Sequence, residues 1–246
     1  MRYFMIFSYD GTNYKGYQKQ PGKKTIQNTI EDILFKLNGE QDVNICATGR
    51  TDAGVHALNQ KAHFDLNKDI DESKLKDSLN KMLPDDIYVK SIEKTTPDFH
   101  ARFSVKAKEY IYKINLGEYN PIEKNYVYQF NKRLDINEME RALKYLEGEH
   151  NFKSFTKSTD EINDYTRTIL QTSITRDIKN SNVIIISLVG TGFLRYMVRN
   201  IVGLLIEIGE GKRKSEDVFE ILAFENREAA GITAPPNGLY LKDVFY

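Results

Sequence analysis

The order of predicted elements indicates an α+β fold built from two successive split β-α-β units. Short runs of alternating apolar residues predict strands, helical periodicity appears between these runs, and the order β-α-β-β-α-β occurs twice. This order is typical of ferredoxin-like and RNA-recognition domains, in which two helices cover one face of an antiparallel sheet. The two halves share no residue-level similarity, so only the element order repeats.

The first half contains the clearest helix. Thr25 is a suitable N-cap, apolar residues then recur at helical spacing, and Gly39 stands where a helix C-terminus is expected. Residues 1–9 alternate aromatic and aliphatic side chains and predict a strand. The remaining strands are expected at residues 43–47, 60–66 and 87–92, and one further helix is expected at residues 71–83.

The second half follows the same order with longer parts. Asp135 is placed to cap a helix, and the polar run KNSN at residues 179–182 predicts a hairpin turn. Strands are expected at residues 105–116, 165–177, 183–189 and 239–245, and further helices at 194–208 and 215–223. We therefore expect two domains, residues 1–104 and 105–246.

Net charge gives no indication of the partner, because 35 Lys and Arg balance 35 Asp and Glu. Locally, residues 1–24 carry five basic side chains against one acid, and residues 100–113 carry four against one. A surface with separated basic and acidic regions is therefore expected. The charged fraction of 28% and hydrophobic fraction of 40% are those of a globular chain.

Several classes of protein are excluded by what the sequence lacks. The single Cys46 rules out a disulfide framework and a multi-cysteine metal site, and it is expected to be a small core residue. No apolar run approaches the roughly 20 residues of a membrane helix, and no glycine-rich nucleotide loop is present. We expect a cytoplasmic protein with no membrane partner and no cofactor motif.

Residues 48–56, TGRTDAGVH, have the densest chemistry in the chain. Two glycines let the backbone turn tightly, so Arg50 and Asp52 can project from the loop. The corresponding connection in the second half is a four-residue hairpin, which makes this loop an enlarged one. Such a loop is typical of an active site.

Asp52 is best interpreted as a nucleophile. A metal site would need more ligands than His56 and the more distant His63, and we expect both histidines to be structural. A carboxylate beside an arginine stays ionised, which suits a nucleophile better than a proton donor, and carboxylates attack glycosidic centres. Arg199 lies on an otherwise apolar helix, where an arginine requires a carboxylate, and Asp52 is one candidate.

The run GRTDAGVH at residues 49–56 resembles the signature of the TruA family of tRNA pseudouridine synthases. Other segments resemble the family in the same order: YDG at 9–11 with 14–20, FHARFS at 99–104, KEYIY at 108–112, MVRNIVG at 197–203 and GLYL at 238–241. The resemblance spans essentially the whole chain. Tyr17 stands where members of the family often have Trp, a change that keeps a flat amphipathic ring.

This resemblance implies the pseudouridine synthase fold, with two domains whose sheets meet at a central cleft, and a homodimer. It implies isomerisation of uridines 38–40 in the tRNA anticodon stem-loop, with no metal or organic cofactor. By motif, Asp52 would be the nucleophile and Tyr110 would stack on the target base. Arg50 would help to displace the base, and Arg199 would pair with Asp52.

Two other functions stay open on the sequence alone. A non-catalytic RNA-binding module would use the same aromatic sheet, although a carboxylate among phosphates would repel its ligand. A pseudouridine synthase acting on another RNA would share the mechanism. Attack by Asp52 on the uracil ring and attack on the ribose anomeric carbon are both compatible with the residues.

Overall fold

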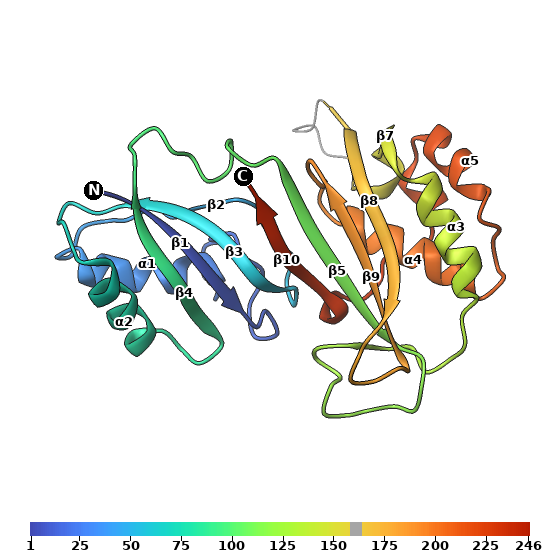
Figure 1. Cartoon of the computed structure of the whole chain (residues 1–246), viewed down its shortest axis with the longest axis horizontal. Helices are drawn as coiled ribbons and strands as arrows, with labels where there is room; N and C mark the ends of the chain where they lie inside the picture. The colour runs from blue at the N-terminus through green and yellow to red at the C-terminus, as the bar shows by residue number, and fades with distance from the viewer. Residues whose placement is uncertain (158–163) are drawn as a thin grey trace. The chain divides into compact units, whose positions relative to one another are not determined.

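The computed structural model describes residues 1–157 and 164–246, which form two compact units (Figure 1). The first unit comprises Met1–Lys106 together with Tyr240–Tyr246, and the second comprises Ala107–Leu239. Each unit combines an antiparallel sheet with helices, which confirms the α+β class. Within the described residues, no helix is long and apolar enough to cross a membrane.

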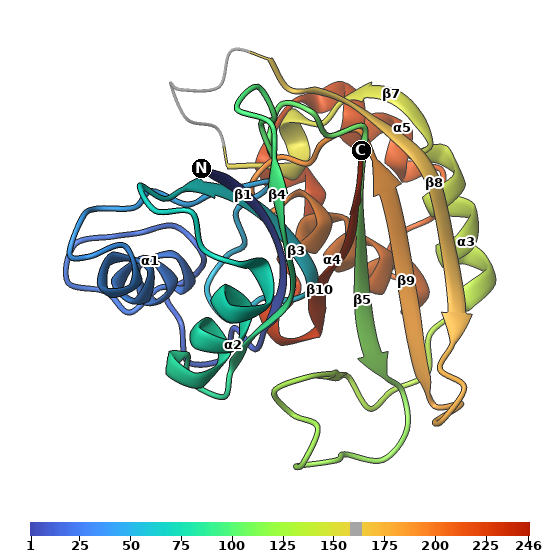
Figure 2. The same ribbon diagram turned by 60° about the vertical axis from the view of Figure 1, so that its left-hand side comes forward.

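The sheet of the first unit is centred on β1 (Arg2–Tyr9), which pairs antiparallel with both β3 (His56–Asp65) and β4 (Ile87–Thr95). Alternate residues of β1 are buried, as expected for a strand with one face in the core. Helices α1 (Ile26–Leu37) and α2 (Glu72–Met82) lie on one side of this sheet (Figure 2).

Helix α1 begins as the sequence predicts. The Thr25 side chain accepts a hydrogen bond from the backbone N–H of Asn28, and the Asn28 side chain accepts one from the backbone N–H of Thr25. Ile26, Ile30 and Leu34 then form the buried stripe that holds the helix on the sheet.

The outer edge of β3 has two partners. At residues 62 and 63 it pairs antiparallel with β2 (Cys46–Ala47), and at residues 56 and 57 it pairs parallel with β10 (Leu239–Phe245). The chain therefore leaves the edge of β3 after Ala47 and re-enters the sheet at His56, where β3 pairs with β10 instead of β2. Residues 48–55, which we call the Asp52 loop, span this exchange.

The second unit has its own antiparallel sheet, in the order β5 (Ala107–Asn115), β9 (Val183–Gly190), β8 (Thr166–Arg176) and β7 (Gly148–Asn151). A short strand, β6 (Tyr128–Gln129), pairs parallel with β5. The predicted hairpin joins β8 to β9, closed by a hydrogen bond from the Asp177 N–H to the Val183 carbonyl.

Helices α3 (Ile136–Tyr145) and α4 (Met197–Gly209) cover one face of this sheet (Figure 2). Helix α4 is buried along most of its length, and α5 (Asp217–Phe224) packs beside α3. In the described part of this unit, 3-10 turns lie at Lys153–Phe155, Arg227–Ala230 and Pro236–Gly238.

Most predicted elements are confirmed, with several differences. Strand β2 has two residues, β3 begins at His56 instead of residue 60, and α4 begins at Met197 instead of residue 194. Strands β6 and β7 were not predicted, β6 because it has two residues and β7 because it is polar. A further difference concerns the last strand, which was expected to complete the second domain as part of residues 105–246. Residues Tyr240–Tyr246 lie with the first unit instead, because β10 pairs with β3.

Candidate active site

The Asp52 loop is anchored to the first unit through Thr51. The Thr51 carbonyl accepts a hydrogen bond from the Tyr17 N–H at 3.0 Å, and its hydroxyl lies 2.8 Å from the Tyr9 hydroxyl in a buried position. A turn follows, closed by the Val55 N–H donating to the Asp52 carbonyl at 3.2 Å. Both residues that flank this turn, Thr51 and Val55, are buried.

Two glycines allow this close packing. A Cβ at Gly11 would lie 2.0 Å from the Val55 carbonyl oxygen, so only glycine permits the backbones to approach so closely. Gly16 has φ of +95°, and a Cβ there would lie 2.9 Å from the Thr51 carbonyl oxygen. The segments YDG at 9–11 and YKGY at 14–17, which precede α1, therefore pack directly against the backbone of the Asp52 loop.

The start of the loop is fixed by Gln60 of β3, which is fully buried. Its side-chain oxygen accepts from the Thr48 hydroxyl at 2.7 Å, and its side-chain nitrogen donates to the Gly49 carbonyl at 3.0 Å. Gln60 carries no motif of its own, and sequence reasoning missed it. The sequence offered one signal for it, which is that Gln60 falls on the buried face of the alternating strand β3.

The Asp52 side chain is half-exposed, whereas Thr51 before it and Val55 three residues after it are buried. Arg50 lies two residues earlier in the same loop and is exposed. A backbone held from several directions places a carboxylate in a defined position without covering it, which is what nucleophilic attack on a bound molecule requires.

Tyr110 and Arg199 belong to the second unit. Tyr110 lies in β5, is 7% exposed, and packs edge-on against Phe193 with ring centroids 5.1 Å apart. Arg199 lies in the first turn of α4, and its Nε–H donates to the Ala234 carbonyl at 2.8 Å. The two residues predicted in the first unit share one loop, and the combination of all four in one site stays a prediction.

His56 and His63 are held by hydrogen bonds and ring packing within the first unit. His56 is buried, its Nδ1 lies 3.2 Å from the Gly11 nitrogen and 3.1 Å from an Asp10 carboxylate oxygen, and its ring stacks on Tyr240. His63 accepts a hydrogen bond from the Ala101 N–H through Nδ1. Burial lowers the pKa of His63, which favours the neutral ring that this bond needs.

Cys46, His63 and His100 lie together, with ligand atoms all within 4.8 Å of one another, a grouping that sequence spacing did not reveal. Nδ1 of His100 accepts from the backbone N–H groups of Arg102 and Phe103, as Nδ1 of His63 does from Ala101. Each neutral ring therefore carries its proton on Nε2. A metal would require lone pairs there, so these hydrogen bonds oppose ligation.

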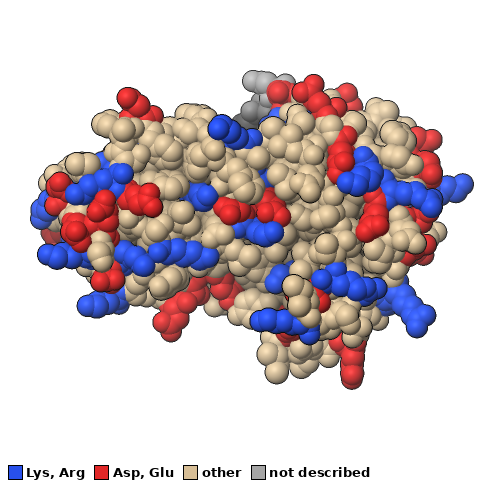
Figure 3. Space-filling model, in the orientation of Figure 1, with Lys and Arg blue, Asp and Glu red and all other residues tan. Residues whose placement is uncertain are grey.

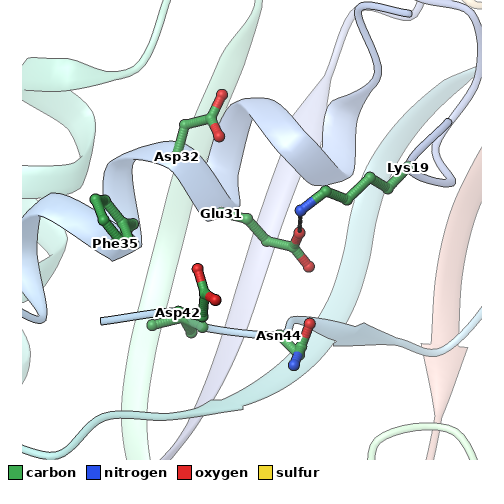
Figure 4. Close-up of a pocket in the computed structure, with 7 residues that line it drawn as sticks. Lys19, Glu31, Asp32, Phe35, Asp42 and Asn44 are labelled. Atoms are coloured by element: carbon green, nitrogen blue, oxygen red, sulfur yellow. Dashed lines mark hydrogen bonds and ion pairs between the residues drawn. The ribbon is translucent and has the colours of Figure 1, made fainter. Parts of the chain in front are cut away.

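A pocket of about 350 Å³ lies between α1 and the segment before β2 (Figure 4). Glu31 on its wall is 4% exposed and accepts hydrogen bonds from Lys19, Gln27 and the Ile45 N–H. Asp32 and Asp42 add negative charge to the lining. Phosphate groups would be repelled here, so this pocket is a poor candidate for an RNA site.

Comparison with known proteins identifies the chemistry to which this geometry belongs. The profile of the tRNA pseudouridine synthase family matches residues 5–104 and 142–246. A tRNA pseudouridine synthase A from Bacillus pumilus is 46% identical over 242 residues, covering 97% of this chain and 96% of the relative. Proteins of the same name from Geobacillus sp. and Streptococcus mutans are 41% and 42% identical, and the matches cover 97% and 100% of this chain and 96% and 99% of the relatives.

These matches run across both units, include the Asp52 loop and favour an enzyme over a binding module. The chain therefore belongs to the tRNA pseudouridine synthase family and is an enzyme that isomerises uridine to pseudouridine in tRNA.

Proposed function

We propose that this enzyme modifies uridines 38–40 in the anticodon stem-loop of tRNA, with Asp52 as the nucleophile. The observation that carries the proposal is the geometry of the Asp52 loop: Thr51 and Val55 are buried and hydrogen-bonded, while the Asp52 carboxylate between them is half-exposed. A carboxylate fixed in this way meets its target with little loss of conformational freedom.

The chemistry needs no external reactant. Asp52 attacks either the uracil ring or the ribose anomeric carbon, and the bond between the ribose and N1 of the base breaks. The detached base rotates and is rejoined to the ribose through C5. On the ribose path this step displaces Asp52 from the anomeric carbon, and on the uracil path the bond from Asp52 to the ring breaks afterwards. The C5 proton is lost and N1 gains one, so the product is an isomer of the substrate.

The target base must leave its stacked position in the stem, which costs a few kcal/mol. Stacking of that base on Tyr110 is worth roughly 1–3 kcal/mol and offsets part of this cost. Arg50, which is exposed in the same loop as Asp52, is proposed to fill the vacated position or to hold a phosphate.

Arg199 is proposed to pair with Asp52 and to keep it ionised, because an opposite charge lowers the pKa of a carboxyl group. Arg199→Ala should then abolish turnover beyond any loss of tRNA affinity. Unimpaired turnover of this variant would remove Arg199 from the site.

Basic side chains of the first unit are proposed to bind the tRNA backbone. Lys15, Lys23 and Lys24 are exposed in the segment that supports the Asp52 loop, and the Tyr17 N–H joins that segment to Thr51. The face in Figure 3 carries acids and bases intermixed, in keeping with zero net charge. We therefore expect a few local phosphate contacts rather than a uniformly basic surface.

The test is to map pseudouridine in unmodified tRNA after incubation with the protein. Modification at positions 38–40 supports the proposal, and modification only outside the anticodon arm contradicts its substrate assignment. The family resemblance also predicts a homodimer in the cytoplasm. Light scattering on the purified protein distinguishes a dimer from a 28.5 kDa monomer.

A further inference from the structure

Residues 231–235, which we call the strap, lie directly on the backbone of α4. A Cβ at Gly203 would be 1.9 Å from the Ile232 carbonyl oxygen, so the strap touches the helix where the helix has no side chain. The Ile232 N–H donates to the Glu207 carboxylate at 3.2 Å, and the Ala234 N–H donates to the Arg199 carbonyl at 3.0 Å. The strap thus follows α4 over two turns and ends at Arg199.

The strap also contacts the guanidinium group of Arg199. The Arg199 Nε–H donates to the Ala234 carbonyl at 2.8 Å, so Arg199 and Ala234 exchange two hydrogen bonds. Because Nε–H is engaged by the strap, a carboxylate that pairs with Arg199 would be met through the two Nη nitrogens. The position of the strap therefore determines where those donors lie.

The strap is held by a second arginine. Arg227 donates through Nη1 to the Gly231 carbonyl at 2.8 Å, and through Nη2 to the Thr233 hydroxyl at 2.7 Å and the Asn200 side-chain oxygen at 2.9 Å. The Thr233 hydroxyl donates in turn to the same Asn200 oxygen at 2.6 Å. Asn200 is fully buried in α4 beside Arg199, so the network joins strap and helix directly.

We propose that Arg227, acting through Thr233 and Asn200, is a positioning residue for Arg199. It fixes the strap so that the Ala234 carbonyl holds the Arg199 guanidinium in one orientation before tRNA binds. A pre-organised guanidinium loses less freedom when it meets its carboxylate. This inference rests on the proposed role of Arg199, and its failure can be distinguished from a failure of that role.

The experiment measures kcat and KM of Arg227→Gln and Thr233→Val, each in the wild-type and in the Arg199→Lys background. In the wild-type background, kcat should fall about tenfold for Arg227→Gln and less for Thr233→Val, with KM nearly unchanged, because the reacting groups are misplaced. Lysine has no Nε–H for Ala234, so neither substitution should lower kcat further in the Arg199→Lys background.

Arg141→Gln serves as the matched control, since it removes an exposed arginine of α3 whose ion pair is with its helix neighbour Glu138, and it should leave kcat unchanged. An equal loss of kcat from Arg227→Gln in both backgrounds, or a lower Tm with unchanged kcat, would show a purely structural role and overturn the inference. Thr233→Val decides the question if Arg227→Gln does not fold. Full activity of Arg199→Ala would instead contradict the proposed function of Arg199.

Discussion

The hydroxyl of Tyr9 lies 2.8 Å from the hydroxyl of Thr51, in the buried base of the Asp52 loop. Tyr9 ends β1, the strand between β3 and β4, so this contact joins the loop to a central strand of the sheet. Burial raises the pKa of Tyr9 to about 12, and the hydroxyl therefore remains protonated at neutral pH. The loop thus depends on a neutral hydrogen bond to a core strand.

Tyr9→Phe should lower both stability and turnover. Loss of the hydroxyl leaves that of Thr51 without this partner, which should reduce the free energy of unfolding by about 1–2 kcal/mol and loosen the loop. Denaturant unfolding and single-turnover rates measure the two effects. Tyr3→Phe is the matched control, because the Tyr3 hydroxyl bonds to the Ile70 backbone from the same strand and should change stability alone. Equal turnover in both variants would contradict the role of Tyr9.

Gly11→Ala should displace the Asp52 loop, because the added Cβ would lie 2.0 Å from the Val55 carbonyl oxygen. We expect a loss of about 1–3 kcal/mol in the free energy of unfolding, together with lower activity. Gly22→Ala has positive φ but nothing within 4 Å of the new Cβ, so it should lower stability alone. Thermal unfolding and kcat of the two variants, measured side by side, test this difference.

The first unit should lose stability in mild acid through His63. Burial lowers the pKa of His63 below its usual value of 6.5, so the unfolded chain binds a proton that the folded chain does not. The neutral His63 ring therefore makes its full contribution to the free energy of unfolding above about pH 6.5, and this contribution is lost as the pH falls below that value. Unfolding free energies from pH 7.5 to 5 should therefore decline more steeply in wild type than in His63→Gln. Parallel curves would contradict this assignment.

Local signals in the sequence were sufficient to predict most of the elements, whereas the role of Asp52 stays a prediction. Thr25, the periodic isoleucines of α1 and the hairpin at residues 179–182 act within a few residues, so their structures could be predicted. The pairing of β10 with β3 joins residues 240 and 56, and no short-range pattern encodes such a partner. For the same reason, the sequence could not reveal that Gly11 packs on Val55 or that Gln60 fixes Thr48.

Salt dependence should reveal the phosphate contacts of the first unit. Lys15→Ala is expected to weaken tRNA binding and to reduce the slope of log K against log salt by roughly 0.7–0.9, the value for one phosphate contact. Lys94→Ala is the control, because Lys94 pairs with Asp69 at 2.6 Å on a different part of the unit. Filter binding at several salt concentrations gives both slopes. Identical slopes for wild type and Lys15→Ala would contradict the contact.

The most direct test of the central claim is pseudouridine formation by Asp52→Asn. The substitution keeps the size of the side chain and removes the nucleophilic carboxylate, while the loop anchors at Thr51 and Val55 are unchanged. We predict wild-type tRNA affinity and Tm with no pseudouridine formed under single-turnover conditions. Normal pseudouridine formation by Asp52→Asn would contradict the assignment of Asp52 as the nucleophile.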